Sequence, residues 1–579
     1  MEHAKSWTTL HQLVGYKMPL VDIVATIRKF DRREGLFTLA RIAADLANRR
    51  GGVTGPDARA WTHDLLVQRI GSSNALEDAV SRAVSELGPG TAIAHGHVLF
   101  VLQHLMLQCG SEAQRVAHHG ELAFLMLALN DHLPQWAEES PNLSTTEHTL
   151  GSMLFATVFN ETSDDPIRFI LRITEILGGE IQDGPIGASE WEEIQREAFG
   201  CSFKEYVQRF IVPVFMFSRT WGSMKPPALR PSAWAKRPTS DLYRRWFAEA
   251  STPLGAPAAD PSAADGTPSL RLPGSFFRYP FVQVDDAAVC VSPWHVRDHA
   301  SLGTWSKLNN ASKKVLNTDS NQRFTSTFGY LFERWCAALA VEASAHRGFK
   351  GKVLLPSFPG AQDEIEDVVV VDRDRVALFS AKSSLVPETK LKSAPNVAVM
   401  VDWLRRFFFE DQVSAKASGY RAGALHLLDR KVQRIKAGEY EDRGIRRGVM
   451  IIPVVVSFDN VGESGILYRW IEQECARLGI LSARPQVRPL TILTPDDYEA
   501  LLALATRRRR LCDLLVDKTR RAERWARTDW FLSRQETDGR KLRLPGMEKR
   551  FDDLVEQSRK FMREAGLFED DLPEGSVGS

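Results

Sequence analysis

A carboxylate, a hydroxyl and an ammonium group occur within one short stretch of the sequence, at Asp367, Ser380 and Lys382. Between Asp367 and Ser380 lie two apolar runs, 368–371 and 376–379, which flank a charged tetrad. Apolar runs around a short polar segment predict a β-hairpin. Carboxylates that hold a divalent cation, together with a lysine that orients water, can support phosphodiester hydrolysis. The hairpin would have to bring the three side chains together.

The register of the hairpin decides which side chains share a face. If Val371 pairs with Val376, Asp367 pairs with Ser380, and a two-residue or a four-residue loop gives the same result. Side chains alternate between the two faces of a strand. We therefore expect Asp367, Ser380 and Lys382 on one face, with Lys382 diagonally beside Asp367.

These residues resemble the core motif of the PD-(D/E)XK, or restriction-endonuclease-like, nuclease superfamily. Members carry an acid at the start of one strand and an acid-x-Lys on the next, and Asp367 and Lys382 match the first acid and the lysine. Ser380 departs from the pattern, because it stands where the family usually has Glu or Asp. The resemblance covers about residues 305–455 in motifs and about 275–500 in element order.

The segments on either side of the hairpin extend the resemblance. Residues 328–335, Phe-Gly-Tyr-Leu-Phe-Glu-Arg-Trp, look like the family's preceding helix, and Glu333 matches its acid. Residues 422–429 resemble the helix start after the lysine, with His426-Leu427 where many relatives carry Gln-Leu. By periodicity, Glu333 lies off the apolar stripe of its predicted helix, so a solvated surface role is equally compatible with the pattern.

The resemblance implies a site for Mg²⁺ or Mn²⁺ that is held by Asp367 and Glu333, with Lys382 orienting or activating the attacking water. Mg²⁺ prefers oxygen ligands and keeps several waters, so two protein carboxylates can suffice. The neutral hydroxyl of Ser380 is a poor ligand by comparison. Carboxylates that lie nearby in the sequence and could substitute for it are Asp363, Glu364 and Glu366.

Length and composition describe an ordinary globular protein with several domains. The chain has 579 residues, 44% of them hydrophobic, and a net charge of +1. It shows no secretory signal and no apolar run of membrane-spanning length, so we expect no membrane partner. The six cysteines are scattered without a CxxC pair, which favours a reducing, cytoplasmic setting.

We expect a multidomain α+β protein, which consists of an all-α N-terminal domain (1–250), a linker (251–272), an α/β restriction-endonuclease-like core with a central mixed sheet (273–500) and a helical C-terminal extension (501–579). The linker is rich in Pro, Ala, Ser and Gly. Two strands around an Asp-Asp turn are predicted in 279–292, and a buried strand in 448–457. Helices are predicted near 57–70, 75–87, 91–109, 120–133, 166–178, 189–199, 203–217 and 239–250.

A basic amphipathic helix is predicted in the C-terminal extension, where residues 501–550 carry 15 Lys and Arg against 7 Asp and Glu. Such a helix could neutralise nucleic-acid phosphates. The alternative is a solvated face that pairs with the acidic tail, since charge runs are often surface features. The candidate nucleic-acid contacts are Arg507, Arg508, Arg509, Arg510, Lys518 and Arg521.

Three functional hypotheses follow. The first is a metal-dependent nuclease acting on DNA, or alternatively on RNA, in bacterial defence against phage or mobile DNA, with the helical N-terminal domain controlling it. The second is a nucleic-acid-binding relative that has lost activity through Ser380. The third is a scaffold whose N-terminal domain binds a protein partner. Self-association is compatible with each of them, and fold alone does not decide between them.

Overall fold

The computed structural model describes residues 17–48, 119–132 and most of 166–564, with isolated positions elsewhere between 11 and 150. Within 166–564, the residues that it leaves undescribed are 180, 182–183, 220–227, 230–239, 255–278, 285–286, 357–364, 384–396, 411–422, 460, 462–464, 482–485, 508, 521–522 and 536–542. The predicted helices at 57–70 and 75–87, and most of 91–109, lie outside the described part of the chain.

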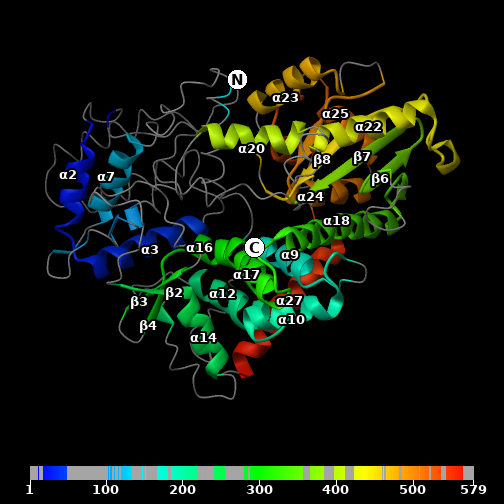
Figure 1. Cartoon of the computed structure of the whole chain (residues 1–579). Helices are drawn as coiled ribbons and strands as arrows, with labels where there is room; N and C mark the ends of the chain where they lie inside the picture. The colour runs from blue at the N-terminus through cyan, green and yellow to red at the C-terminus, as the bar shows by residue number, and fades with distance from the viewer. Residues whose placement is uncertain are drawn as a thin grey trace.

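The predicted hairpin lies inside a mixed five-stranded sheet with strand order β5-β6-β7-β8-β9 (Figure 1). The β5–β6 and β6–β7 pairs are antiparallel, whereas β7–β8 and β8–β9 are parallel. The expected strand at 448–457 is confirmed as the buried β8. The strands are β5 (Lys352–Leu354), β6 (Val368–Asp372), β7 (Arg375–Lys382), β8 (Met450–Ser457) and β9 (Thr491–Leu493).

The register of the hairpin agrees with the prediction. Val371 pairs with Val376, and Asp372 pairs with Arg375, which leaves a two-residue turn. Arg373 in this turn has a φ of 58°, the left-handed conformation that tight hairpin turns require. The ladder ends at the pair Val368–Phe379, so the pairing expected between Asp367 and Ser380 is not part of it.

Helices cover both faces of this sheet, so the strand alternation separates two hydrophobic cores. Val368, Ala377 and Phe379 pack in one core with α18 (Gln322–Ala345), whose apolar stripe is buried as predicted. Val376 and Leu378 pack in the other core with α20 (Val397–Phe409) and α22 (Ala424–Ala437). The remaining elements on this side are η4 (Glu441–Arg443) and α23 (Gly465–Leu478).

The chain before α18 is largely helical where it is described, and the predicted helices there are confirmed to within a few residues. In Figure 1, α18 lies between the sheet and the helices α9 and α10. The described elements are α2 (Leu20–Ile27), α3 (Arg32–Asn48), α7 (His119–Asn130), α9 (Pro166–Leu177), α10 (Ala188–Phe199), α11 (Phe203–Tyr206), the π-helix η2 (Val207–Ile211), α12 (Val212–Arg219), α14 (Ser240–Ala250), α16 (Pro293–Asp298), the π-helix η3 (His299–Gly303) and α17 (Thr304–Val315).

A second sheet corrects the predicted linker at its first residues. The expected pair of strands around an Asp-Asp turn is confirmed, and Val284 pairs with Ala287 across it. Ser251 and the next two residues form a strand parallel to β3, although the linker was predicted to begin there. This sheet has the order β1-β4-β3-β2, with β1 (Ala228–Leu229), β2 (Ser251–Pro253), β3 (Phe281–Val284) and β4 (Ala287–Cys290).

The hydrophobic core runs across the predicted boundaries at residues 250 and 500. One buried cluster contains Ile170 of α9, Phe332 of α18, Leu501 of α24 (Pro495–Arg507) and Met562 of α27 (Pro545–Glu564). A buried ion pair also joins α9 to α24, because Arg172 Nε lies 3.0 Å from Glu499 Oε1. Helices that precede the central sheet in the sequence and helices that follow it therefore both pack near α18.

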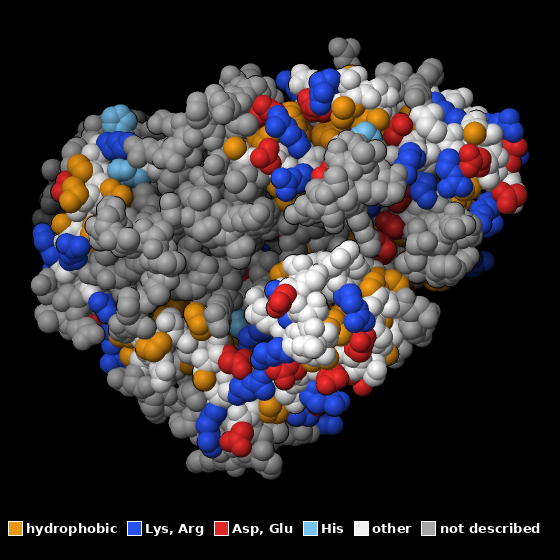
Figure 2. All heavy atoms as spheres, viewed as in Figure 1, with side chains coloured by type: hydrophobic (Ala, Val, Ile, Leu, Met, Phe, Trp, Pro, Cys, Tyr) orange, Lys and Arg blue, Asp and Glu red, His pale blue; other side chains and the backbone are white. Residues whose placement is uncertain are grey.

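The C-terminal basic region differs from the single helix predicted. Non-helical residues at 509–510, 519–520 and 523–527 separate its helices, so its cations do not line one continuous helix face. The elements are α24 (Pro495–Arg507), α25 (Leu511–Lys518), α26 (Thr528–Gln535) and α27 (Pro545–Glu564). Charged side chains of both signs are interspersed over the described atoms in Figure 2. None of the described helices is long and apolar enough to span a membrane.

Candidate active site at one end of the hairpin

Asp367 lies in a bend immediately before β6, at the end of the hairpin away from the turn. Its Oδ2 atom accepts a hydrogen bond of 2.6 Å from the backbone N–H of Ala381, and the residue is 9% exposed. The side chain thus bonds to the backbone of β7 beyond the last ladder pair. Because a bond from a backbone N–H to a carboxylate is short and charge-assisted, one carboxylate oxygen is held in place between Ser380 and Lys382.

Glu366 brings a second buried carboxylate to the same place. Burial and the neighbouring Asp367 raise its pKa to about 8, although Lys382, Lys431 and Ser380 oppose the shift. Its Oε2 atom has no hydrogen-bond partner among the described residues. A buried carboxylate with an orphaned oxygen and a raised pKa would be stabilised by a cation. We call Glu366, Asp367, Ser380 and Lys382 the site end of the hairpin.

The bend at Asp367 changes which acid lies beside Ser380. We predicted that the alternation of side chains would extend beyond Val368 to Asp367, which would place Asp367 beside Ser380. In the structure β6 begins at Val368, and the Ser380 hydroxyl lowers the pKa of Glu366. Ser380 is fully buried, and its Oγ forms no hydrogen bond of normal geometry with a described residue. Glu366 therefore supplies a carboxylate near the position where Ser380 lacks one.

Two lysines approach the carboxylate pair from different elements. Lys382 is half-buried at the end of β7, opposite Ser457 of β8. Lys431 is half-buried on α22 and, like Lys382, lowers the pKa of Glu366. Lys431 was not among the site residues predicted from the sequence. The sequence feature that could have identified Lys431 is its position on the apolar stripe of the helix. It lies three residues after Leu428 and four before Ile435, both of which are buried.

Glu333 lies on the opposite side of the sheet from Lys431, on α18. A Cβ added to Gly329 would lie 3.2 Å from Ser383 Oγ, so this glycine lets α18 approach the chain just after Lys382. Glu333 is one helical turn further along, and residues four apart on a helix are neighbours. Burial chiefly raises the pKa of the Cys336 thiol, and Asp367 and Glu333 both add to the shift. Glu333 and Asp367 thus both lie near Cys336, and Glu333 is half-buried.

The donor set fits a hard cation such as Mg²⁺ or Mn²⁺. The nearby oxygen donors are the carboxylates of Glu366 and Asp367, the hydroxyl of Ser380 and, from α18, Glu333. Within the described residues, no three His, Cys, Asp or Glu side chains converge as ready-made ligands. Mg²⁺ usually keeps several waters and needs only one or two carboxylates. The other two acids expected nearby, Asp363 and Glu364, lie outside the described residues.

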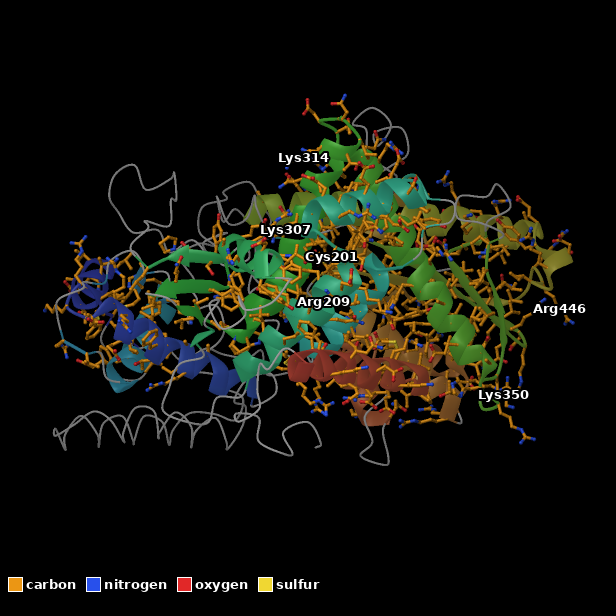
Figure 3. The ribbon with its side chains drawn as sticks, turned by 90° about the horizontal axis from the view of Figure 1, so that it is seen from below. Cys201, Arg209, Lys307, Lys314, Lys350 and Arg446 are labelled. Atoms are coloured by element: carbon orange, nitrogen blue, oxygen red, sulfur yellow. The ribbon has the colours of Figure 1, made fainter. Side chains whose placement is uncertain are left out.

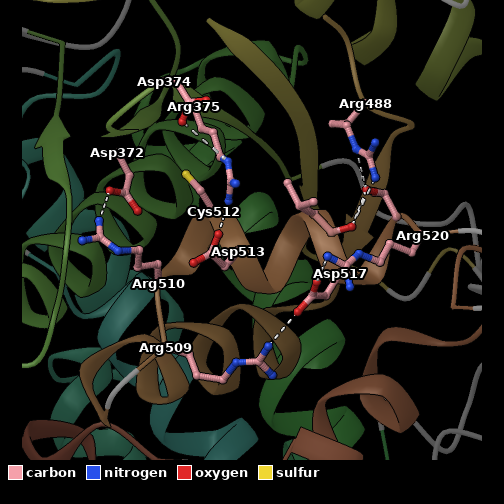
Figure 4. A network of polar contacts seen from close by, with 12 residues as sticks. Asp372, Asp374, Arg375, Arg488, Arg509, Arg510, Cys512, Asp513, Asp517 and Arg520 are labelled. Atoms are coloured by element: carbon pink, nitrogen blue, oxygen red, sulfur yellow. Dashed lines mark hydrogen bonds and ion pairs between the residues drawn. The ribbon is translucent and has the colours of Figure 1, made fainter. Parts of the chain in front are cut away.

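The turn end of the hairpin, residues 372–375, is held by the basic segment that was predicted to bind nucleic acid. Buried Asp372 pairs with Arg510, and Arg375 pairs with Asp513 of α25 (Figure 4). Arg509 contacts Asp517 at 2.6 Å. These arginines are therefore engaged within the protein.

The other candidate nucleic-acid contacts differ in their exposure. Lys518 is 3% exposed, and its Nζ donates to the carbonyl of Ala526 at 2.7 Å. Arg507, at the end of α24, is exposed. Arg508 and Arg521 lie outside the described residues. A sequence pattern of cations could not distinguish these environments, because each depends on a partner distant in the chain.

Comparison of the chain with protein-family models, with curated proteins and with solved structures gave no significant match.

Proposed function

We propose that this protein is a metal-dependent nuclease that hydrolyses phosphodiester bonds of DNA at the site end of the hairpin. The observation that carries the proposal is the buried pair Glu366 and Asp367, flanked by Lys382 and Lys431. A cation between these carboxylates would offset the buried charge that raises the pKa of Glu366. When bound, such an ion would stabilise charge on the attacking and leaving oxygens of the phosphodiester.

The protein's own residues would have distinct tasks. The hydrogen bond from Ala381 fixes one oxygen of Asp367 and so orients its carboxylate at the site end. Lys382 would orient the attacking water and offset phosphate charge, because an ammonium group donates hydrogen bonds and carries a fixed charge. Lys431 would contact the phosphate from the α22 side. Glu333 would add a carboxylate from α18, directly or through a water.

The element order supports membership of the restriction-endonuclease-like fold. A long helix, three antiparallel strands, two helices and a parallel strand follow one another as α18, β5, β6, β7, α20, α22 and β8, with the short η4 between α22 and β8. Fold alone does not establish activity, so the carboxylate pair carries more weight. We further propose that the enzyme acts in bacterial defence and that the helical region before α18 controls it. The indole of Trp335 on α18 donates to Glu175 of α9 at 3.1 Å, which gives that region a direct contact to the helix bearing Glu333.

The test is cleavage of supercoiled plasmid, linear duplex, single-stranded DNA and RNA by the full-length protein with Mg²⁺ or Mn²⁺. Asp367→Asn, Lys382→Gln and Glu366→Gln should each lower the rate of cleavage strongly, by about 10³-fold for Asp367→Asn. Asp374→Asn is the matched control, because this aspartate lies in the turn of the same hairpin with its side chain 79% exposed. Cleavage that survives Asp367→Asn and Lys382→Gln together would refute the site. Cleavage of RNA alone would change the substrate to RNA.

Ser380 favours a second candidate function, a nuclease-fold protein that binds nucleic acid without cutting it and serves as a subunit of a larger assembly. The neutral, fully buried hydroxyl stands where a catalytic acid would be expected from the resemblance. Binding without cleavage under every metal condition would support this alternative. If Ser380→Asp then produced metal-dependent cleavage, the missing acid would be the cause of inactivity.

A further inference from the structure

The edge of the central sheet at the turn end carries a concentration of exposed cations. Lys352 on β5 pairs opposite Val371, and Arg373 lies in the turn two residues later. Lys350 precedes the edge strand and reaches the outer rim of the molecule in Figure 3. All three side chains belong to exposed residues. The β5–β6 pairing therefore brings cations from two separate segments to one surface.

Close backbone contacts add two further arginines to this surface. A Cβ on Gly348 would lie 3.7 Å from the backbone nitrogen of Arg507 and closer still to Thr506. The segment after α18 therefore lies directly against the C-terminal end of α24. Arg347 precedes Gly348, and both arginines are exposed. We call the resulting surface the basic edge, and its members are Arg347, Lys350, Lys352, Arg373 and Arg507.

The basic edge differs in its charge balance from surface regions where exposed cations are paired with carboxylates. Several exposed cations elsewhere have such partners, as in the pairs Lys314–Glu197 at 3.0 Å and Arg477–Glu474 at 2.7 Å. By contrast, the side chains of Lys352 and Arg373 form no ion pair with any residue that the structure describes. Nearby Arg375 and Arg510 are neutralised by Asp513 and Asp372. A local excess of positive charge thus exists in a chain whose net charge is only +1.

A simpler reason for one of these cations is protection of the sheet edge. Lysine on an edge strand discourages pairing with another chain, which accounts for Lys352 of β5. It does not account for Arg373 in the turn or Arg507 on a helix. An excess of cations from three segments is better suited to a polyanion.

We propose that the basic edge binds the sugar-phosphate backbone of the nucleic acid whose scissile phosphate lies at the site end. The identification of the polyanion as nucleic acid rests on the proposed function. Val371, opposite Lys352, is four residues from Asp367, which is about 13 Å along the strand at about 3.3 Å per residue. Successive phosphates of one strand are about 3.4 Å apart along a duplex axis. The basic edge would therefore contact phosphates about four nucleotides from the cleavage position.

The test is binding of a labelled DNA duplex of about 30 base pairs and an RNA of the same length, measured by anisotropy in EDTA over a range of salt. The variant combines Lys350→Gln, Lys352→Gln and Arg373→Asn, since Asn tolerates the left-handed φ of Arg373. The matched control combines Lys29→Gln, Lys204→Gln and Lys549→Gln, which are exposed on other elements. Thermal unfolding would verify that both triple variants fold.

Loss of three phosphate contacts should make the slope of log K against log salt shallower by about 3 for duplex DNA, with about tenfold weaker binding in moderate salt. The control should match the wild type. An unchanged slope in the variant, or failure of the wild type to bind either nucleic acid, would overturn the inference. Binding in EDTA needs no catalysis. Salt-dependent binding without cleavage would therefore refute the proposed nuclease activity but still support nucleic-acid binding by the basic edge.

Discussion

The two ends of the β6–β7 hairpin bury acidic residues in opposite ways. At the turn end, Asp372 is 5% exposed and pairs with Arg510, and α25 contributes Asp513 to hold Arg375. At the site end, Glu366 and Asp367 are adjacent and buried, and the pKa of Glu366 is raised by burial and by Asp367 in spite of two nearby lysines. The buried acid of the turn end has a cationic partner, whereas the buried charge of the two acids at the site end is not fully offset.

A stabilised strand pair can hold together carboxylates that repel each other. A buried ion pair is costly to break, because removal of one partner leaves an uncompensated charge. Like charges placed together in an interior cost stability, and functional sites commonly contain such arrangements. We infer that the ion pairs at the turn end stabilise the hairpin and that the site end uses that stability to hold two carboxylates together.

The largest effect is expected on cleavage, when one carboxylate at the site end is replaced by an amide. Asp367→Asn should lower cleavage by about 10³-fold, a range typical for loss of an essential group that acts on the attacking water or its metal. Its stability should change little, because the Asn side-chain oxygen can still accept the hydrogen bond from Ala381. Rates of plasmid cleavage and urea unfolding of the same preparation would measure both effects. Near wild-type cleavage would contradict the assignment.

Asp372→Asn, the same change at the other end of β6, should do the reverse. It leaves Arg510 without its buried partner, so we expect a loss of about 2–3 kcal/mol in the free energy of unfolding. Cleavage measured well below the unfolding transition should stay within about twofold of wild type. A matched control is Asp553→Asn on the exposed face of α27. If Asp372→Asn abolished cleavage in a fully folded protein, the separation of roles between the ends would be wrong.

Glu366→Gln should stabilise the protein without divalent metal, and the gain should grow with pH. The folded pKa of Glu366 is raised to about 8, so its stabilising contribution is complete below the unfolded pKa and is lost as pH rises through about 8. The wild type should therefore lose on the order of 1–3 kcal/mol relative to the variant between pH 5 and pH 8. Urea unfolding in EDTA measures this difference. Glu193→Gln, on the exposed surface of α10, should show no such trend, and a variant curve parallel to wild type would refute the buried-charge interpretation.

The smallest expected effect concerns the turn. Arg373 adopts a φ of 58°, a conformation that costs a residue with a side chain about 1 kcal/mol more than glycine. Arg373→Gly should therefore stabilise the hairpin by roughly 0.5 kcal/mol after the added entropy of the unfolded chain is subtracted. Urea unfolding against Arg347→Gly, outside the turn, measures it. Destabilisation larger than in that control would show that the arginine side chain stabilises the turn.

The hairpin could be predicted because its determinants are local. Two valine-rich runs around a polar tetrad specify strands, turn and register, and the apolar spacing from Phe328 to Leu339 similarly specifies α18. The bend at Asp367 interrupts the alternation of side chains along the strand. A prediction from alternation therefore placed Asp367, and not Glu366, beside Ser380. The partners of Arg509 and Arg510 could not be inferred from composition, because ion pairing depends on which distant segments the tertiary fold brings together.

The central claim is that the site end binds a divalent cation through Glu366 and Asp367. Titration of the full-length protein with Mn²⁺, followed by electron paramagnetic resonance of the free ion, tests it without any substrate or activity. We expect saturable binding in the wild type and in Asp372→Asn, and loss of that binding in Asp367→Asn and Glu366→Gln. Equal Mn²⁺ binding by the wild type and both site-end variants, or none by the wild type, would contradict it.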